Sequence, residues 1–273
     1  MSTTSITILH DIDFLGADRE EKMDAYLPDQ ERYPGPRPAI VLIHGGGWRI
    51  LDKRSPREVS IGNDLADAGY AVFSINYLLN VGEKDESGVM RLSRVAWPQN
   101  FYDCKSAVRF IRKESTTYRV DPQRIGVMGG SAGGHFSMLV GSTIHNEEFN
   151  REGLYTDESN EVSCILNFYG DYDLINRKSK PFPQETPEKT LEVEKLASPI
   201  TWIDSNTPPM FITHGTADGI ISVERSRKLA VHLENLGLDY TYVEISKAPH
   251  SYDLHPQQMD LKAIVLEFLN KYL

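Results

Sequence analysis

The sequence is poor in cysteine, with only Cys104 and Cys164 among its 273 residues. They form no CxxC pair and have no spacing typical of a zinc site. Each lies in an apolar segment, so we expect two buried free thiols. The eight histidines show no HExxH motif and no carboxylate-paired spacing that would hold a metal. The sequence therefore implies no metal and no other cofactor.

Long hydrophobic runs are also lacking. No apolar stretch approaches the roughly 18 residues that a membrane-spanning helix needs. The first residues, MSTTSITILHD, have neither the basic region nor the apolar region of a signal peptide. As it stands, the sequence predicts a cytoplasmic protein without a membrane partner. A secreted protein trimmed of its signal peptide would look the same, so that alternative stays open.

Positive charge is in deficit, because 29 lysines and arginines face 39 aspartates and glutamates. The formal net charge is −10. An acidic surface argues against nucleic acid or an anionic membrane as a partner. It also disfavours polyanionic substrates, although local charge can override the total. Nothing in the sequence indicates the number of subunits.

Strand and helix patterns alternate from residue 39 to the end. The apolar run AIVLIHG, residues 39–45, is typical of a strand buried on both faces. Residues 98–114 carry apolar side chains on one face at helical spacing. This alternation predicts an α/β fold with a mostly parallel sheet and helices on both faces. Segments 5–14 and 21–27 are expected to precede it as two antiparallel strands.

We expect the whole chain, 1–273, to form a single domain with loop insertions at about 143–161 and 171–207. Both segments are polar and too long for simple connections. Long loops of this kind are often lids or binding loops. Residues 78–97, which include Gly82 and Gly88, are expected to form a further loop.

Gly129, Ser131 and Gly133 form a G-x-S-x-G motif between a predicted strand and a predicted helix. A serine on such a sharp turn has strained backbone angles, and larger residues two places either side would clash. The turn exposes the serine Oγ and places the Ala132 amide at a helix N-terminus, where it can face a developing negative charge. The pattern favours a nucleophile, although a glycine-rich turn that only packs helix on strand would look similar.

A serine nucleophile needs a base, and the base needs an acid to orient it. Asp218 and His250 each follow a predicted strand, in the chain order Ser, acid, His. All three therefore lie at the same edge of the sheet. We predict Ser131, Asp218 and His250 as the catalytic residues. Asp171 and Asp173 are the rival candidates for the acid, and either one can instead line the pocket or cap a helix.

Two other histidines are weaker candidates for the base. His214 ends its strand too early, and we expect it to pack in the interior. His255 opens the last helix and is expected on the surface.

The stretch HGGGW, residues 44–48, follows the buried strand 39–43. The tetrahedral oxyanion of acyl transfer needs a second donor besides the Ala132 amide. The amides of Gly46 and Gly47 can approach it closely because no Cβ intervenes. We therefore predict an oxyanion hole of Gly46, Gly47 and Ala132. His44 is expected to hold the loop through a side-chain hydrogen bond, and Trp48 lies either in the core or in the wall of an acyl pocket.

The motifs HGGGW, GGSAGGH, HGTAD and APH, in this order, resemble those of α/β-hydrolase esterases. They are most similar to the small carbohydrate acetyl and feruloyl esterases related to the hormone-sensitive-lipase group. The resemblance covers residues ~39–273 and implies the α/β-hydrolase fold with the same triad and oxyanion donors, the Trp48 amide being an alternative to one glycine. Two departures are the short segment before HGGG and the sequence SYD after the base, where many relatives have a glycine and an aromatic residue.

The expected activity is that of a serine carboxylic-ester hydrolase. It would remove short acyl groups, acetyl first, or feruloyl groups from carbohydrate or other small esters through an acyl-enzyme. Trp48, Trp97 and Tyr172 are candidate substrate-binding residues, with Tyr77 and Tyr169 expected in the core. The partner is then a small-molecule or oligosaccharide ester.

Two alternatives remain open at this point. An arylformamidase or a small-peptide hydrolase would use the same triad. A non-catalytic hydrolase-fold binding protein should have lost a triad member or the glycine loop, and this chain has both.

Overall fold

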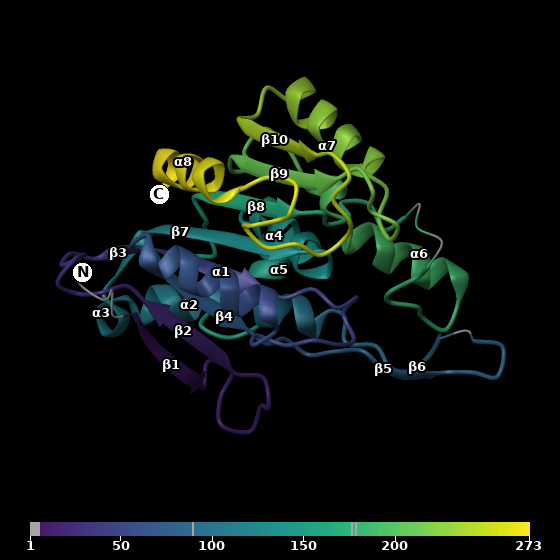
Figure 1. Cartoon of the computed structure of the whole chain (residues 1–273). Coiled ribbons are helices and arrows are strands. Elements are labelled where there is room, and N and C mark those ends of the chain that lie inside the picture. The colour runs from purple at the N-terminus through teal and green to yellow at the C-terminus, as the bar shows by residue number, and fades with distance from the viewer. Residues whose placement is uncertain (1–5, 89, 176, 178) are drawn as a thin grey trace.

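The computed structural model describes residues 6–88, 90–175, 177 and 179–273. An eight-stranded sheet crosses the molecule in the order β1-β2-β4-β3-β7-β8-β9-β10 (Figure 1). Strand β1 pairs antiparallel with β2, and β2 pairs antiparallel with β4, whereas the pairs from β4 to β10 are parallel. The strands are β1 (Thr7–Ile12), β2 (Met23–Leu27), β3 (Arg37–Ile43), β4 (Ala71–Ile75), β7 (Val120–Gly130), β8 (Cys164–Phe168), β9 (Met210–Gly215) and β10 (Tyr240–Ile245). The predicted mostly parallel sheet with antiparallel N-terminal strands is confirmed.

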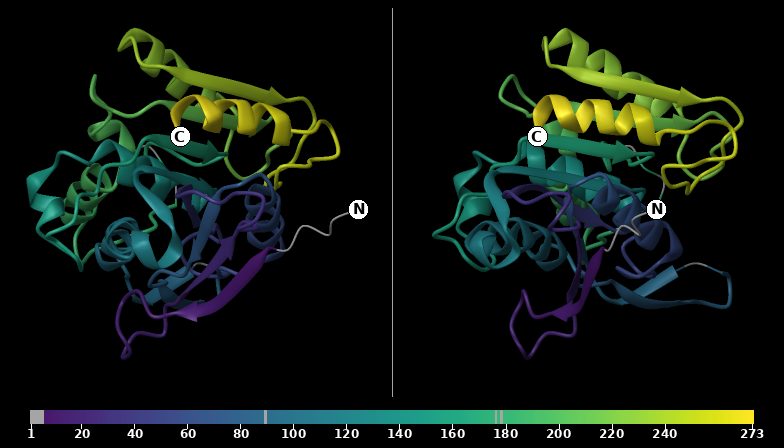
Figure 2. Two further views of the ribbon diagram at one scale, coloured as in Figure 1. Left: turned by 90° about the vertical axis from the view of Figure 1, so that its left-hand side faces the viewer. Right: turned by 60° about the vertical axis from the view of Figure 1, so that its left-hand side comes forward.

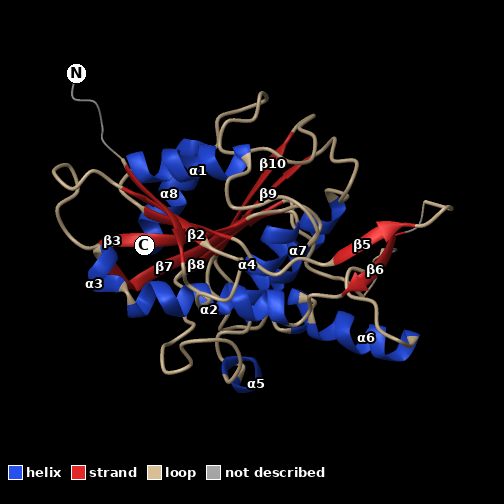
Figure 3. Cartoon of the chain, turned by 90° about the horizontal axis from the view of Figure 1, so that it is seen from below, coloured by secondary structure: helices blue, strands red, loops and turns tan. Residues whose placement is uncertain are grey.

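Helices cover both faces of the sheet (Figure 3). On one face lie α1 (Pro56–Asp67) and α8 (Lys262–Tyr272), and on the other lie α2 (Gln99–Lys113), α4 (Ala132–Ser142) and α7 (Glu224–Asn235). Strand β3 shows why the sheet needs both layers. Its side chains alternate, so that Ile40 and Leu42 pack under α1 and α8, whereas Val41 and Ile43 pack under the other three helices. All four are completely buried, as the continuous apolar run predicts.

All three segments expected as loops contain regular structure, although 143–161 holds only the four-residue helix α5 (Glu147–Asn150). Residues 78–97 include a hairpin of β5 (Val81–Lys84) and β6 (Met90–Arg94) that projects from the body (Figure 2). Its strands are mostly exposed, so they lack the apolar alternation that marks a half-buried strand. The insertion 171–207 contains α6 (Pro187–Leu196) and a 3-10 turn (Pro199–Thr201). Thr186, which caps α6, and Pro187 directly after it form a sequence pattern that predicts the start of a helix.

The remaining helices are short, namely α3 (Ser115–Tyr118) and α5 (Glu147–Asn150). Within the described ranges, none of the helices combines the length and the apolarity that crossing a bilayer would require. Cys104 and Cys164 are both buried and free, as expected from the sequence.

Candidate active site

Ser131 lies at the tip of a sharp turn between β7 and α4, with φ +56° and ψ −119°. This is an uncommon conformation for a residue with a Cβ. The turn is held by the Ser131 amide, which donates to the carbonyl of Phe168 at 2.9 Å. A Cβ on Gly129 would overlap the backbone of Gly133, and a Cβ on Gly133 would overlap the carbonyl of Ile43. The two flanking glycines therefore have the steric reason that the motif predicts.

The structure brings together the three side chains selected from the sequence. His250 Nε2 lies 2.9 Å from Ser131 Oγ, and His250 Nδ1 lies 2.6 Å from Asp218 Oδ2. Ser131, Asp218 and His250 follow β7, β9 and β10, so they meet at the carboxyl edge of the sheet. Both distances are within hydrogen-bond reach for a relay from serine to imidazole to carboxylate. The arrangement is chemically able to activate a serine hydroxyl.

The Asp218 carboxylate is surrounded by donors. Its Oδ1 accepts from the amides of Ile220 and Ile221 at 2.8 and 2.9 Å, and its Oδ2 faces the Nε2 of His214 at 3.1 Å besides His250. Burial raises the pKa of Asp218, but the hydrogen bonds from His214, His250 and the two amides outweigh it and hold the pKa well below its usual range. The carboxylate is therefore ionised and able to stabilise an imidazolium.

His214 is a residue whose role the sequence reasoning missed, because packing was all that was expected of it. Its Nδ1 lies 2.7 Å from Ser226 Oγ, and its Nε2 faces both Asp218 Oδ2 and the Ile221 carbonyl. Because Nε2 faces two acceptors, it carries the hydrogen, and the Ser226 hydroxyl donates to Nδ1. The only sign in the sequence was the spacing of His214 four residues before Asp218.

The rival acids face arginines. Asp171 lies 3.4 Å from Arg177 and 3.5 Å from Arg225, and Asp173 lies 3.3 Å from Arg225. The carboxylate hydrogen-bonded to His250 is Asp218. His255 is on the exposed surface beside α1, as expected.

A cavity of about 670 Å³ opens beside Ser131. It is lined by segments 45–51, 55–58 and 130–132 and by residues that follow β8, β9 and β10. Gly46, Gly47 and Ala132 are all part of the lining. Gly46 and Gly47 have φ values of +94° and +60°, and a Cβ on Gly46 would also overlap the Ile50 carbonyl. The loop shape therefore requires glycine at position 46 and favours it at position 47, and their service as oxyanion donors stays a prediction.

His44 holds the backbone of the glycine loop, residues 44–48, in place. Its Nδ1 donates to the carbonyl of Gly45 at 2.8 Å, and its ring stacks on Tyr77 with the centroids 4.4 Å apart. The Tyr77 hydroxyl donates in turn to the His44 carbonyl at 3.0 Å. Burial lowers the pKa of His44 to about 4, so the ring is neutral near pH 7. The expected loop-holding hydrogen bond is present.

Trp48 belongs to the core and to the cavity wall at once. It is buried, it lines the cavity, and its indole N–H donates to His135 Nδ1 at 3.3 Å. Tyr169, which was expected in the core, is also part of the wall, with its ring centroid 4.8 Å from that of His250.

The structure places Trp97 and Tyr172 in the core, against the expectation that they bind substrate. Trp97 stacks on Phe101 at 5.6 Å and packs beside Phe182 at 5.4 Å. Tyr172 is buried in the same cluster, and neither residue lines the cavity at Ser131. A continuous aromatic core attracts both rings more strongly than a solvent-facing site would. Tyr77 is in this core as well, as expected.

Helix α1 holds the segment that carries the base. The carbonyl of Tyr252 accepts from Arg57 Nε at 2.9 Å and from the Tyr169 hydroxyl at 2.8 Å, and Ser60 Oγ donates to Asp253 at 2.7 Å. Ser251 has φ +71°, a backbone conformation that glycine adopts most readily. The SYD sequence after His250 is therefore accommodated by contacts from α1.

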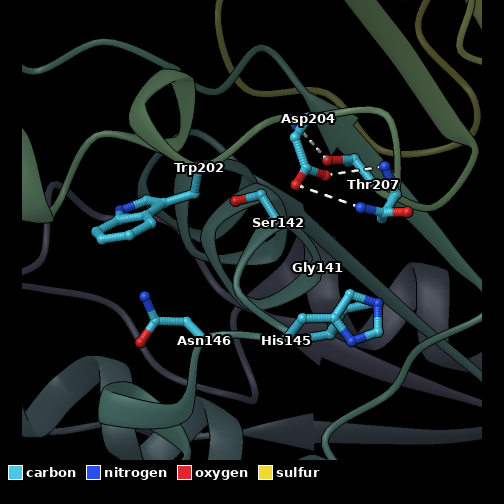
Figure 4. A pocket seen from close by; sticks show the side chains of 9 residues that line it. Gly141, Ser142, His145, Asn146, Trp202, Asp204 and Thr207 are labelled. Atoms are coloured by element: carbon cyan, nitrogen blue, oxygen red, sulfur yellow. Dashed lines mark hydrogen bonds between the residues drawn. The ribbon is translucent and has the colours of Figure 1, made fainter.

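A second hollow, of about 190 Å³, lies at the C-terminal end of α4 (Figure 4). Trp202 and Asp204 border one side of it, and His145 and Asn146 border the other. Helix α4 begins directly after Ser131 and has 11 residues, so this hollow is about 16 Å from the serine. It shares no lining residue with the cavity at Ser131.

The chain matches one family model and is similar to several known proteins. Residues 23–233 match the family model BD-FAE. Esterase LipQ of Mycobacterium tuberculosis is 29% identical over 257 residues, which are 89% of this chain and 57% of that protein. Esterase LipC of the same organism is 28% identical over 80% of this chain and 54% of that protein. The chain thus spans little more than half the length of these curated relatives.

Solved structures are similar over almost the whole chain. A truncated form of a carbohydrate esterase from gut microbiota has a TM-score of 0.80 and 25% identity, covering 99% of this chain and 97% of that one. The apo form of Thermogutta terrifontis esterase 2 has a TM-score of 0.71 and 25% identity, covering 99% and 95%. The α/β-hydrolase fold and the esterase resemblance predicted from the sequence are confirmed.

Proposed function

The chain belongs to the BD-FAE family, and on this premise we propose that it is a serine carboxylic-ester hydrolase. The observation that carries the proposal is the hydrogen-bonded series from Ser131 Oγ through His250 to Asp218, with distances of 2.9 and 2.6 Å, at the wall of a cavity. Its relatives LipQ and LipC are named esterases.

In the proposed reaction the ester carbonyl carbon lies against Ser131 Oγ. His250 Nε2 takes the serine proton as Oγ attacks, and the carbonyl oxygen becomes an oxyanion that the amides of Gly46, Gly47 and Ala132 stabilise. His250 then gives its proton to the departing alcohol, which leaves an acyl-enzyme. Water, activated by His250, attacks the acyl-enzyme and releases the acid. Asp218 stabilises the imidazolium in both halves of the cycle.

The substrate we propose is a carbohydrate or other small ester with a short acyl group, acetyl first, or a feruloyl group. The likeness to the gut carbohydrate esterase supports the carbohydrate part. The cavity of about 670 Å³ leaves room for the ester and for part of its alcohol.

The test is a set of initial rates on p-nitrophenyl acetate, butyrate and octanoate. We expect acetate to be hydrolysed fastest and Ser131→Ala to lose at least about 10⁴-fold in kcat. Ser142→Ala is the matched control, because it removes the same hydroxyl from the other end of α4. Equal rates for Ser131→Ala and the unmodified protein would refute the serine mechanism, and a preference for octanoate would refute the short-acyl proposal. Acetylated and feruloylated xylo-oligosaccharides then separate the two acyl groups.

A further inference from the structure

The cavity at Ser131 differs in charge from the molecule around it. Arg49, Arg57 and Arg177 line it, together with the carboxylates of Glu58 and Asp171. The lining therefore has one guanidinium more than these carboxylates, in a chain of net charge −10. A local reversal of this kind attracts ligands that the total charge would repel.

Arg57 has a donor without an acceptor. Its Nε donates to the Tyr252 carbonyl at 2.9 Å and its Nη1 to Glu58 at 2.7 Å. Its Nη2 is buried and has no hydrogen-bond partner in the described part of the chain. Buried donors are rarely left unsatisfied in native structures. A Cβ on Gly130 would lie 2.8 Å from the guanidinium carbon, so the unpaired group is packed against the residue that precedes the nucleophile.

Arg49 supplies the uncompensated charge. Its side chain makes no hydrogen bond or ion pair with another described residue. By contrast, Arg57 is paired with Glu58, and Arg177 lies 3.4 Å from Asp171. The two carboxylates of the lining are thus already engaged, and neither pairs with Arg49 or with the Nη2 of Arg57.

The N-terminus of α1 also favours an anionic ligand in this cavity. Segment 55–58, which lines the cavity, is the start of this 12-residue helix. Ser55, the residue before the helix, makes no capping bond, and its hydroxyl accepts from the Asp52 amide at 3.2 Å instead. Pro56 has no N–H, so the amides of Arg57 and Glu58, together with the helix dipole, favour negative charge at this wall.

There is space for a substrate that extends beyond its ester. A further cavity, of about 640 Å³, adjoins the cavity at Ser131. The two share Asp171, Arg177, Ile220 and Ile221. Arg225 lines this further cavity. Arg177 lies at the junction, with its guanidinium 5.4 Å from the ring centroid of Trp48.

We propose that the ester substrate carries an anionic group, and that Arg49, the Nη2 of Arg57 and the first turn of α1 bind this group while Ser131 attacks the ester. The proposal rests on the proposed esterase function and narrows its substrate class to acylated acidic sugars. The arginines would recognise the negatively charged oxygens of this group, which a carboxylate and a sulfate both supply. The composition predicts that an acidic chain disfavours such substrates, but the charged groups that line this cavity have an excess of positive charge.

The first experiment measures kcat/KM on matched esters. The pair is an acetylated methyl glucuronoside and the corresponding acetylated methyl glucoside, and an acetylated methyl glucoside 6-sulfate tells carboxylate from sulfate. We expect an acidic ester to be preferred about tenfold at low salt and the preference to shrink at high salt. Arg49→Gln should lower this preference about fivefold, and Arg49→Lys should keep part of it.

Arg151→Gln is the matched control, because it removes the same charge from an exposed side chain outside the cavity. Its preference should equal that of the unmodified protein. The inference is overturned, and the esterase function stands, if neutral and acidic esters react equally well and Arg49→Gln changes nothing.

A second experiment does not depend on turnover. Calorimetric titration of the Ser131→Ala protein with methyl glucuronoside and with methyl glucoside measures binding alone. We expect the acidic sugar to bind about tenfold tighter. If no acetyl ester is hydrolysed by the unmodified protein, the proposed function fails, whereas tighter binding of the acidic sugar here still supports the anion site. Equal binding of the two sugars overturns it.

Discussion

At the scale of single residues, Asp218 is the most strongly held group of the site. Two backbone amides occupy Oδ1, and two imidazoles face Oδ2. The amides of Ile220 and Ile221 fix the carboxylate plane, so that Oδ2 points at His250. His214 shares that oxygen and thereby limits how much negative charge His250 feels. His214 thus acts on His250 only through the carboxylate that both imidazoles face.

We predict that His214→Leu lowers kcat about tenfold on p-nitrophenyl acetate and leaves KM nearly unchanged, because Asp218 Oδ2 loses a contact that holds it in position toward His250. Loss of the second donor concentrates charge on Asp218 Oδ2, which stabilises the His250 imidazolium. The acidic limb of the pH–rate profile should therefore move to higher pH. His214→Gln, whose amide can still donate to Asp218, should restore most of the rate. An acidic limb that stays in place would mean that His214 only packs, and the thermal midpoint of each variant separates that case from misfolding.

At the scale of elements, the site depends on how closely α4 approaches β3. The backbone of Gly133 on α4 lies against the carbonyl of Ile43 on β3, with no space for a side chain between them. The same contact places the Ala132 amide beside the glycine loop that follows β3. The contact that packs α4 on β3 therefore also positions the predicted oxyanion hole.

We predict that Gly133→Ala lowers the free energy of unfolding by about 1–3 kcal/mol and abolishes most ester hydrolysis, because its Cβ overlaps the Ile43 carbonyl. Gly47→Ala is the comparison. A Cβ there meets nothing within 4 Å, but φ is +60°, so the cost is only about 1–2 kcal/mol. Urea unfolding and acetate rates measure both effects. A Gly133→Ala protein as stable as the parent would show that the helix can shift away.

The elements differ in how well their sequences predicted them. Strand β3 was predictable because burial on both faces requires an unbroken apolar run. The hairpin β5–β6 was not, because its exposed side chains impose no pattern. Ser131, Asp218 and His250 could be proposed because each follows a predicted strand. The part played by His214 depends on Ser226 and Ile221, which only the folded chain brings to it, and the same holds for the core position of Trp97.

At the scale of the whole molecule, two buried histidines link the site to overall stability. His135 donates from Nε2 to the Ala197 carbonyl at 2.6 Å and accepts at Nδ1 from Trp48. The Nε2 of His44 is buried and has no partner within the described residues. A proton added to either ring would therefore be a buried charge without an acceptor. Burial lowers the pKa of His44 to about 4 and that of His135 to about 3.

We predict that the free energy of unfolding falls as the pH drops from about 6.5 to about 4. Both folded-state pKa values are depressed, so the unfolded chain binds more protons in this window. The stability is complete above the unfolded value and is lost as the pH falls through the folded ones, by about 1.4 kcal/mol per pH unit for each ring. Urea unfolding at pH 7.5, 5.5 and 4.5 measures the slope. His44→Gln and His135→Gln should each reduce this slope by the contribution of about one proton. The depressed pKa of Asp218 does not interfere, because its contribution to stability is lost at lower pH. A slope that neither substitution reduces would place the acid sensitivity elsewhere in the molecule.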